Sequence, residues 1–376
     1  MWRRVEEAFE QPFVGVTTDG HVIEGLRSLR DDGLDPAPLV TAATEALSAM
    51  SAEERASVLL PVDAEEWRHW TNAYATWRPH GLLLTETTDA VREAVVAVLR
   101  TSLSRGGLAE TRACMQLNET LAELYGDHEN LGEWTYRFAV FGTPSLDEPW
   151  GWQLHGHHVD LSTLVVGRQM CLSPVFLGAE PRIADEGRFA GVRAFDDEER
   201  RALDLYHALS PHQIEAAVLF PTMRSDAVPP QLNHPTEGRH QSGAGQDNLV
   251  LPYEGLCAGA MPPRQRELLL RLTDVYVSRW PDGPARAKLR EVHHHLDDTW
   301  FAWVGGGEEG GAFYYRIHSP VILVEFDHHR GVFLDNPEPE PFHVHTIVRT
   351  PNGGDYGRDL LRMHYQRHHT TRAPAR

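Results

Sequence analysis

Cysteine is scarce in this sequence, and segments that could direct the chain into a membrane are missing. The three cysteines, Cys114, Cys171 and Cys257, lie far apart and form no CxxC pair. This spacing favours buried thiols in a reducing compartment over a disulfide framework. The first residues include two arginines but no apolar segment after them, unlike a signal peptide. No run approaches the ~18 apolar residues of a membrane span. These absences predict a cytoplasmic protein without contact to a membrane.

Positive charge is also in short supply. The chain has 35 basic and 54 acidic residues, a formal net charge of −19. A nucleic-acid partner is not expected, because the phosphate backbone would be repelled. The glycine fingerprint of dinucleotide-binding folds, the P-loop and the GxSxG elbow are missing too, so neither a nucleotide cofactor nor a serine-hydrolase mechanism is supported. With 41% hydrophobic and 24% charged residues, the composition is that of a globular protein.

The first third of the chain predicts helices. Residues 36–50 are rich in alanine and leucine, and Ser51 with Glu54 has the pattern of a capping box for the next helix. Residues 88–105 have apolar side chains at helical spacing, and another helix is expected over 108–125. We therefore expect a helical N-terminal region.

From Trp134 onward the pattern changes to short alternating segments typical of antiparallel strands. Strands are expected again from Trp300 to Val348, after a long loop at 221–250 that has no periodicity and is typical of lids, binding elements or disorder. The boundaries predicted are a helical region over 1–130 and a β core with inserted helices over 131–376, joined as one integrated domain. The inserted helices are expected at 196–208, 211–220, 262–280 and 284–297.

Two of the strand segments resemble each other. Phe138 begins FAVFG and is followed, after a turn-rich gap, by His155 in WQLHG; Phe301 begins FAWVG and is followed by His318 in YRIHS. The members of both pairs are separated by 163 residues, which indicates a duplicated strand–turn–strand unit. The predicted fold class is α+β, with an antiparallel sheet or barrel-like core built from the two units and packed with helices.

Histidines gather in two of the predicted strands. WGWQLHGHHVDL carries His155, His157 and His158, and PFHVHTIV carries His343 and His345. Side chains at i and i+2 of a strand share a face, so the HxH pairs set two imidazoles side by side, while His158 is expected on the opposite face. Such a pair can chelate one metal ion, although HxH can also be a polar face in water. The presence of two clusters favours the metal site.

The donors in these motifs narrow the choice of metal. All are imidazoles, which suits copper, zinc, iron or nickel and disfavours magnesium and calcium. An iron site with two histidines and one carboxylate would need Asp160, Glu325 or Asp355, none of which the sequence places. The block at 293–295 is interpreted as a solvated helix face, and His328–His329 as an incidental turn.

Polar residues follow the second cluster directly. Arg349 leaves the strand near the histidines and could bind a substrate carboxylate with two hydrogen bonds. Asp355 is placed to act in the chemistry or, alternatively, to cap the helix expected near Tyr356. Arg349 and Asp355 are therefore the candidate catalytic residues.

The chain resembles a known family in several blocks. YRFAVFGTPS, WGWQLHGHHVDLS, SPVFLGAEP, VLPYEGL, FYYRIHSP and HVHTIVRTPNGGDYGRDLLRMHY occur in this order. Over about residues 40 to 366 it is similar to the family catalogued as domain of unknown function 3500. His155 and His318 depart from the residues typical of that family. The comparison therefore moves the predicted metal ligands to His157, His158, His343 and His345.

The family name implies no activity, so the expected function comes from the residues. We expect a metal-dependent oxidoreductase that uses histidine-bound copper or iron to oxidise a small molecule, with or without a carboxylate, with dioxygen. Its pocket would be walled by Trp150, Trp152, Tyr314 and Tyr315. The alternatives are a zinc-dependent hydrolase with Asp355 or Glu325 as its base, and a non-catalytic metal-binding protein. Whether the chain forms an oligomer is left open.

Overall fold

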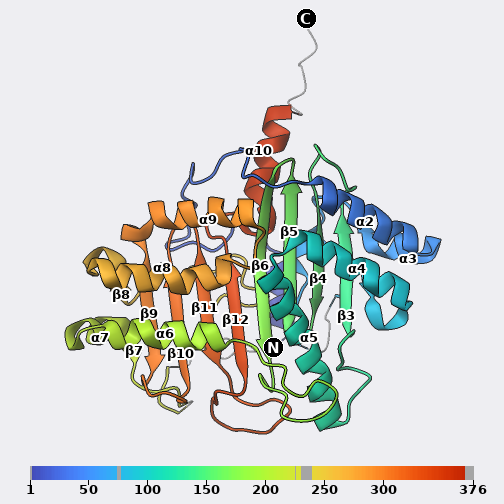
Figure 1. Ribbon diagram of the computed structural model, residues 1–376. Helices are drawn as coiled ribbons and strands as arrows, with labels where there is room; N and C mark the ends of the chain where they lie inside the picture. The colour runs from blue at the N-terminus through green and yellow to red at the C-terminus, as the bar shows by residue number, and fades with distance from the viewer. Residues whose placement is uncertain (1, 74–77, 225, 230–238, 369–376) are drawn as a thin grey trace, which may run out of the picture.

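The fold is built on one large mixed sheet. A computed structural model describes residues 2–73, 78–224, 226–229 and 239–368. Its twelve strands follow the order β1-β3-β4-β5-β6-β12-β11-β10-β9-β7, with β2 paired to β3 and β8 paired to β9 (Figure 1). The sheet is open, because the path ends at β1 and at β7. This is the predicted α+β class, in its open-sheet form.

The strands of the first half are β1 (Leu59–Leu60), β2 (Leu82–Leu83), β3 (Tyr136–Phe141), β4 (Trp150–Gly156), β5 (Val159–Val166) and β6 (Gln169–Ala179). Those of the second half are β7 (Val218–Phe220), β8 (Leu256–Cys257), β9 (Trp300–Gly305), β10 (Phe313–His318), β11 (Leu323–His328) and β12 (Val344–Arg349). The α-helices are α1 (Trp2–Phe9), α2 (Ala37–Ala49), α3 (Ala52–Val58), α4 (Asp89–Ser102), α5 (Arg105–Tyr125), α6 (Asp196–Ala208), α7 (Pro211–Ala217), α8 (Pro263–Val277), α9 (Asp282–His294) and α10 (Arg358–His368).

The predicted duplication is confirmed and extends beyond the strands. Each half has a four-stranded antiparallel meander, β3 to β6 and β9 to β12, and the two meanders join where β6 pairs with β12. The first strand of each meander also pairs with two short strands, one parallel and one antiparallel. These are β1 and β2 on β3 in the first half, and β7 and β8 on β9 in the second half. The helices that precede these strands are repeated in the same order, α2 to α5 and α6 to α9.

The local signals for helices act as expected. Ser51 accepts a hydrogen bond from the Glu54 backbone N–H while the Glu54 side chain accepts one from the Ser51 N–H, which completes the capping box of α3. The helix α5 ends at Gly126, which adopts φ 79°, a left-handed conformation that glycine adopts at little cost.

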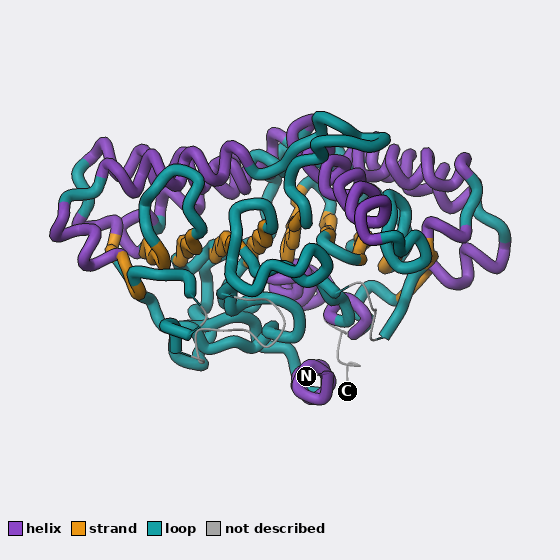
Figure 2. Tube along the Cα trace, turned by 90° about the horizontal axis from the view of Figure 1, so that it is seen from below, coloured by secondary structure: helices purple, strands orange, loops and turns teal. Residues whose placement is uncertain are grey.

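The two faces of the sheet have different cover (Figure 2). Helices α2, α4, α5, α6, α8 and α9 contribute to the core on one face, which we call the helix side. Loops and α10 lie over the other face, the loop side, where Phe176 packs with Tyr356 and Leu360. Strand alternation divides β12 accordingly: Val344 and Val348 belong to the helix-side core, whereas His345 and Ile347 point to the loop side.

This alternation overturns part of the predicted pocket wall. Trp150, Trp152 and Tyr315 belong to the helix-side core, so they lie across the sheet from His345 and cannot wall the site of the histidines. Tyr314 does point to the loop side, where its hydroxyl donates to Glu325 over 2.7 Å.

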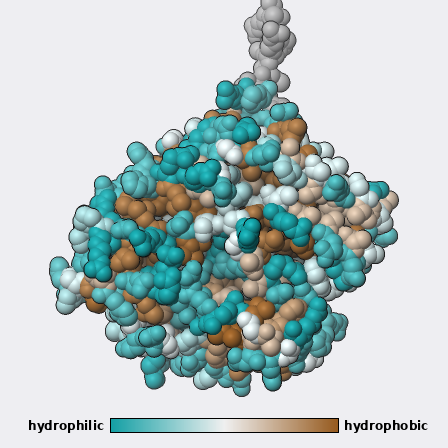
Figure 3. Space-filling model, in the orientation of Figure 1, coloured by the Kyte–Doolittle hydropathy of each residue, from teal (hydrophilic) through white to brown (hydrophobic). Residues whose placement is uncertain are grey.

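The surface is mostly polar. Figure 3 shows hydrophilic residues over most of the helix-side face, with hydrophobic residues scattered among them. Within the described part of the chain, no helix has the length and apolar character needed to cross a membrane.

Candidate metal centre

Three histidines from two distant parts of the chain meet on the loop side. The Nε2 atoms of His343 and His345 lie 2.9 Å apart. The Nε2 atom of His158 lies 3.3 Å from that of His343 and 3.2 Å from that of His345. All three side chains are buried. An ion bound at about 2.0–2.1 Å to each of two imidazoles, at an angle between 90° and 110°, would separate their nitrogens by about 2.8–3.4 Å. The three histidines could therefore hold one metal ion.

His158 reaches this position through a tight turn. The predicted single strand from Trp150 is interrupted after Gly156, and His157 and His158 form the two-residue connection between β4 and β5. His158 adopts φ 64°, which costs a residue other than glycine roughly 1–3 kcal/mol. Its N–H donates to Asn72 and its carbonyl accepts from the Gly178 N–H, so the strained conformation is fixed by the backbone on both sides.

Gly178 provides the floor of the site. It lies directly opposite His345 in the pairing of β12 with β6. A Cβ atom at Gly178 would lie 3.0 Å from Cδ2 of His158 and 3.1 Å from Cδ2 of His345. Glycine therefore leaves the space in which the two imidazoles approach each other.

A hydrogen bond fixes which ring nitrogen of His343 faces the centre. His343 Nδ1 lies 2.9 Å from the Arg330 carbonyl oxygen, which can only accept, so Nδ1 carries the proton and Nε2 presents its lone pair. Burial, and after it the neighbouring histidines, lower the pKa of His158, His343 and His345 well below 6.5. At neutral pH the three side chains are therefore neutral, which is the form that binds metal.

More imidazoles surround the three. His157 stacks on His158 with ring centroids 3.9 Å apart, and its Nδ1 donates to Asn118 over 2.8 Å. His329 stacks on His345 at 4.4 Å, and its Nδ1 lies 3.2 Å from an Asp327 carboxylate oxygen. Asn118 and Asp327 therefore restrict the orientation of the His157 and His329 rings, which pack against the ligands, as the outer shell does at many metal sites.

The predicted ligand set is thus brought together in three of its four members. His157 lies beside the group, bonded to Asn118, and is not part of it. His155 points away: its ring stacks on that of His80 at 4.3 Å. His318, its counterpart in the second half, packs against Tyr253 at 4.7 Å.

The predicted turn at His328 and His329 is wrong for His328, which is the last residue of β11, and neither residue belongs to the group of three histidines. Both are buried: His328 accepts from the Phe313 N–H, and His329 packs in the centre. His240, from the long loop, lies 6.0 Å from the His345 ring. The His–His pair at the end of a predicted strand was the available signal for His329. His329 lies beside the metal group because Asp327 pairs with His345 across the sheet, and no local sequence pattern encodes this pairing.

Arg349 and Asp355 lie in a buried ionic network on the same side of the sheet. Arg349 donates to Asp247 over 2.7 Å and to Asp355 over 3.1 Å, and also to the carbonyls of Ser242 and Gly243. Asp355 accepts further bonds from Ser173 Oγ and the Thr350 N–H. The geometry fits a role in fastening the covering segment to β12, and the predicted role of Arg349 in binding a substrate carboxylate stays a prediction.

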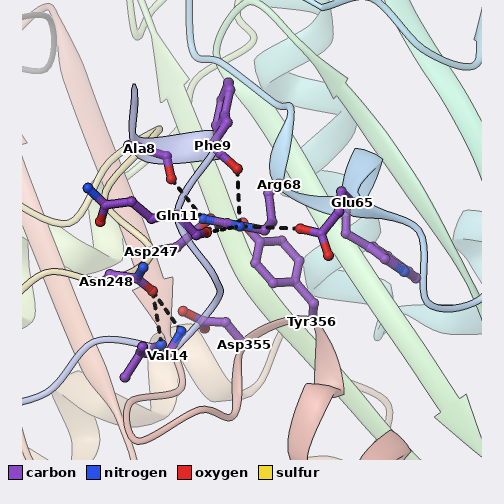
Figure 4. A network of polar contacts seen from close by, with 12 residues as sticks. Ala8, Phe9, Gln11, Val14, Glu65, Arg68, Asp247, Asn248, Asp355 and Tyr356 are labelled. Carbon is purple, nitrogen blue, oxygen red and sulfur yellow. Dashed lines mark hydrogen bonds and ion pairs between the residues drawn. The ribbon is translucent and has the colours of Figure 1, made fainter. Parts of the chain in front are cut away.

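The network continues to the N-terminal segment (Figure 4). Arg68 is buried and bonds Asp247 over 2.9 Å. It also donates to the carbonyls of Ala8, Phe9 and Gln11, as the close-up shows. One carboxylate, Asp247, thereby joins three chain segments over the loop side.

The carboxylates considered for a mixed ligand set lie elsewhere. Glu325 accepts bonds from the N–H groups of Gln241 and Ser242 and from Tyr314. Burial raises the pKa of Asp160 well above its usual value. Among the residues that the structure describes, the group that could hold a metal consists of the three histidines alone.

Fold and site together define an α+β protein with a duplicated open sheet and a buried three-histidine group that could hold a metal ion. The chain belongs to the family described as "Protein of unknown function (DUF3500)", whose model matches residues 33–358 and so includes all three histidines. No curated protein and no solved structure matches the chain.

Proposed function

We propose that this protein is a metal-dependent oxidoreductase that oxidises a small organic molecule with dioxygen. His158, His343 and His345 would hold the metal, copper in first place and iron in second. The observation that carries the proposal is the convergence of three buried imidazole nitrogens within 2.9–3.3 Å of one another. When bound, a redox-active ion would transfer electrons between the organic substrate and dioxygen.

The donor set supports a redox metal. Three neutral imidazoles without a carboxylate suit copper and iron, whereas magnesium and calcium require oxygen ligands. The residues of the chain would keep the three lone pairs aimed at one point and exclude bulk water. The backbone bonds of His158 and the bond from His343 to Arg330 hold the ligands in place.

A zinc-dependent hydrolase is the second candidate. Three histidines with an open fourth position also form catalytic zinc sites. His329, adjacent to the group and oriented by Asp327, is the observation that favours this candidate. Against it, the two bases predicted for a hydrolase, Glu325 and Asp355, have their oxygens occupied by hydrogen bonds.

The decisive experiment is metal analysis of full-length protein purified without a histidine tag. We expect close to one copper or iron ion per chain, and loss of this ion in His345→Ala. His293→Ala, an exposed histidine outside the site, is the matched control and should keep the ion. Oxygen consumption by copper- and iron-loaded protein then separates the candidates.

The possible results have clear meanings. Zinc as the natural metal, with no oxygen consumption after copper or iron loading, would replace the oxidoreductase with the hydrolase. Metal binding without turnover of any kind would indicate a binding protein. Protein that neither contains nor takes up a metal would refute the site itself.

A further inference from the structure

The loop that joins β11 to β12 is fastened beside the three histidines by one buried carboxylate. Glu180 follows directly after β6, and its Oε1 accepts the backbone N–H groups of Val332, Phe333 and Leu334 over 3.0, 3.2 and 3.1 Å. The side chain of Glu180 is fully buried. Three bonds to one carboxylate oxygen fix this part of the loop relative to β6, the strand that carries Gly178.

Phe333 is the residue that this anchor places next to the site. Its ring lies 5.5 Å from the ring of His157, at 74°. His157 in turn stacks on the ligand His158 at 3.9 Å. On the other side, Phe333 meets the Tyr125 ring at 5.0 Å and 77°. The rings thus form a continuous path of contacts from the ligand His158 to the exposed Tyr125.

The outer end of this path is apolar and open to solvent. Val332 is 61% exposed, Tyr125 is 55% exposed and Leu124 is 48% exposed. We call Leu124, Tyr125, Val332 and Phe333 the apolar collar. Single exposed apolar side chains are common on proteins, but a group of them beside a site marks a binding surface. His157, at the inner end, is 6% exposed, more than any of the three ligand histidines.

We propose that the substrate of the metal centre is an apolar small molecule carrying an aromatic or similar ring, and that it reaches the histidines past Phe333. The inference rests on the proposed function. Phe333 is then the residue that determines specificity, because its ring contacts the apolar part of the substrate. Glu180 is a positioning residue: its Oε1 holds the loop, and its Oε2 lies 3.7 Å from Nδ1 of the ligand His343.

A pair of probes tests this proposal without knowledge of the substrate. Copper-loaded full-length protein is titrated with imidazole and with 4-phenylimidazole, which present the same donor nitrogen and differ by one phenyl ring. Binding is followed by the visible absorption and electron paramagnetic resonance of the copper. We expect 4-phenylimidazole to bind about tenfold more tightly than imidazole, because the collar removes its phenyl ring from water.

The variants assign this preference to the loop. Phe333→Ala should reduce the preference to less than about threefold while copper affinity and imidazole affinity stay unchanged. Glu180→Ala should also reduce the preference, and Glu180→Gln should restore part of it because its amide oxygen still accepts hydrogen bonds. Since Oε2 of Glu180 lies 3.7 Å from Nδ1 of the ligand His343, the copper affinity of both variants is measured beside the preference. Leu146→Ala, which removes a side chain that is 49% exposed outside the collar, should behave as the wild type.

The outcomes separate the two proposals. Equal affinity for both probes in copper-loaded wild-type protein would refute the proposal that the substrate is apolar, and would leave the proposed metal centre unaffected. A preference that survives Phe333→Ala would overturn the path past Phe333. Protein that binds no copper would overturn both the metal centre and this inference.

Discussion

The substitution Gly178→Ala tests the metal centre without removing a ligand. The added methyl group would lie 2.9 Å from the Val344 carbonyl oxygen, 3.0 Å from Cδ2 of His158 and 3.1 Å from Cδ2 of His345. The carbonyl belongs to the β6–β12 ladder and cannot move far without breaking it. The two imidazoles must therefore give way, and they move apart from their common centre.

The expected magnitude follows from these contacts. Overpacking of a buried site by one methyl group costs about 1–3 kcal/mol of stability. Disturbance of the groups that orient metal ligands lowers metal affinity about 10–100-fold, which corresponds to roughly 1.4–2.7 kcal/mol. We therefore expect Gly178→Ala to fold, with moderately reduced stability, and to bind copper about 10–100-fold more weakly than the wild type.

Two measurements check this expectation. Isothermal titration with copper gives the metal affinity, and urea unfolding of metal-free protein gives the stability. Gly106→Ala is the control, since its added methyl group would have only Ser104 Oγ within 4 Å, at 3.8 Å. If Gly178→Ala binds copper within about twofold of the wild type while His345→Ala does not bind it, the floor does not set the ligand geometry and this reasoning is refuted.

Three further predictions concern the buried charges and histidines. Arg349→Met should lower the free energy of unfolding by about 3–5 kcal/mol, because Asp247 and Asp355 lose their cation; unchanged stability with weaker substrate binding would instead support a substrate-binding role. Burial lowers the pKa of His318 to about 3, so between pH 6.5 and 3 the unfolded chain takes up a proton that the folded chain does not, and stability falls as the pH falls. His318→Gln should flatten this dependence by about 1.4 kcal/mol per pH unit, and an unchanged slope in urea unfolding between pH 6.5 and 5 would contradict the assignment. Burial raises the pKa of Asp160, so Asp160→Asn should be more stable than the wild type at pH 8. The difference in stability should shrink as the pH falls towards the pKa of an aspartate in the unfolded chain. Thermal unfolding of both proteins at pH 8 and at a lower pH checks this, and a difference that grows on acidification would disprove it.

Local patterns predicted much of the fold. The strand-rich region, the helices that precede it and the duplicated unit were accessible because side-chain periodicity and capping residues act over a few positions. The placement of His343 and His345 on one face also follows from local geometry, since β12 is a regular strand with a period of two.

The same rule was wrong for the first histidine cluster. Alternation predicted that His155 and His157 share a face and that His158 lies opposite. The chain instead turns at His157 and His158, with a left-handed residue where glycine or asparagine is the usual choice. Nothing in HGHH identifies this turn, because the conformation is stabilised by Asn72 and Gly178, which are distant in the sequence.

The sequence by itself determined the class of fold, the two halves, and the kind of donor that a metal would meet. Only the tertiary structure decided which histidines share a centre. His158 and His345 are brought together because β12 pairs with β6 in a register that sets His345 opposite Gly178, which in turn bonds the His158 carbonyl. A register between strands that lie so far apart along the chain depends on the packing of the whole sheet, and no short stretch of residues specifies it.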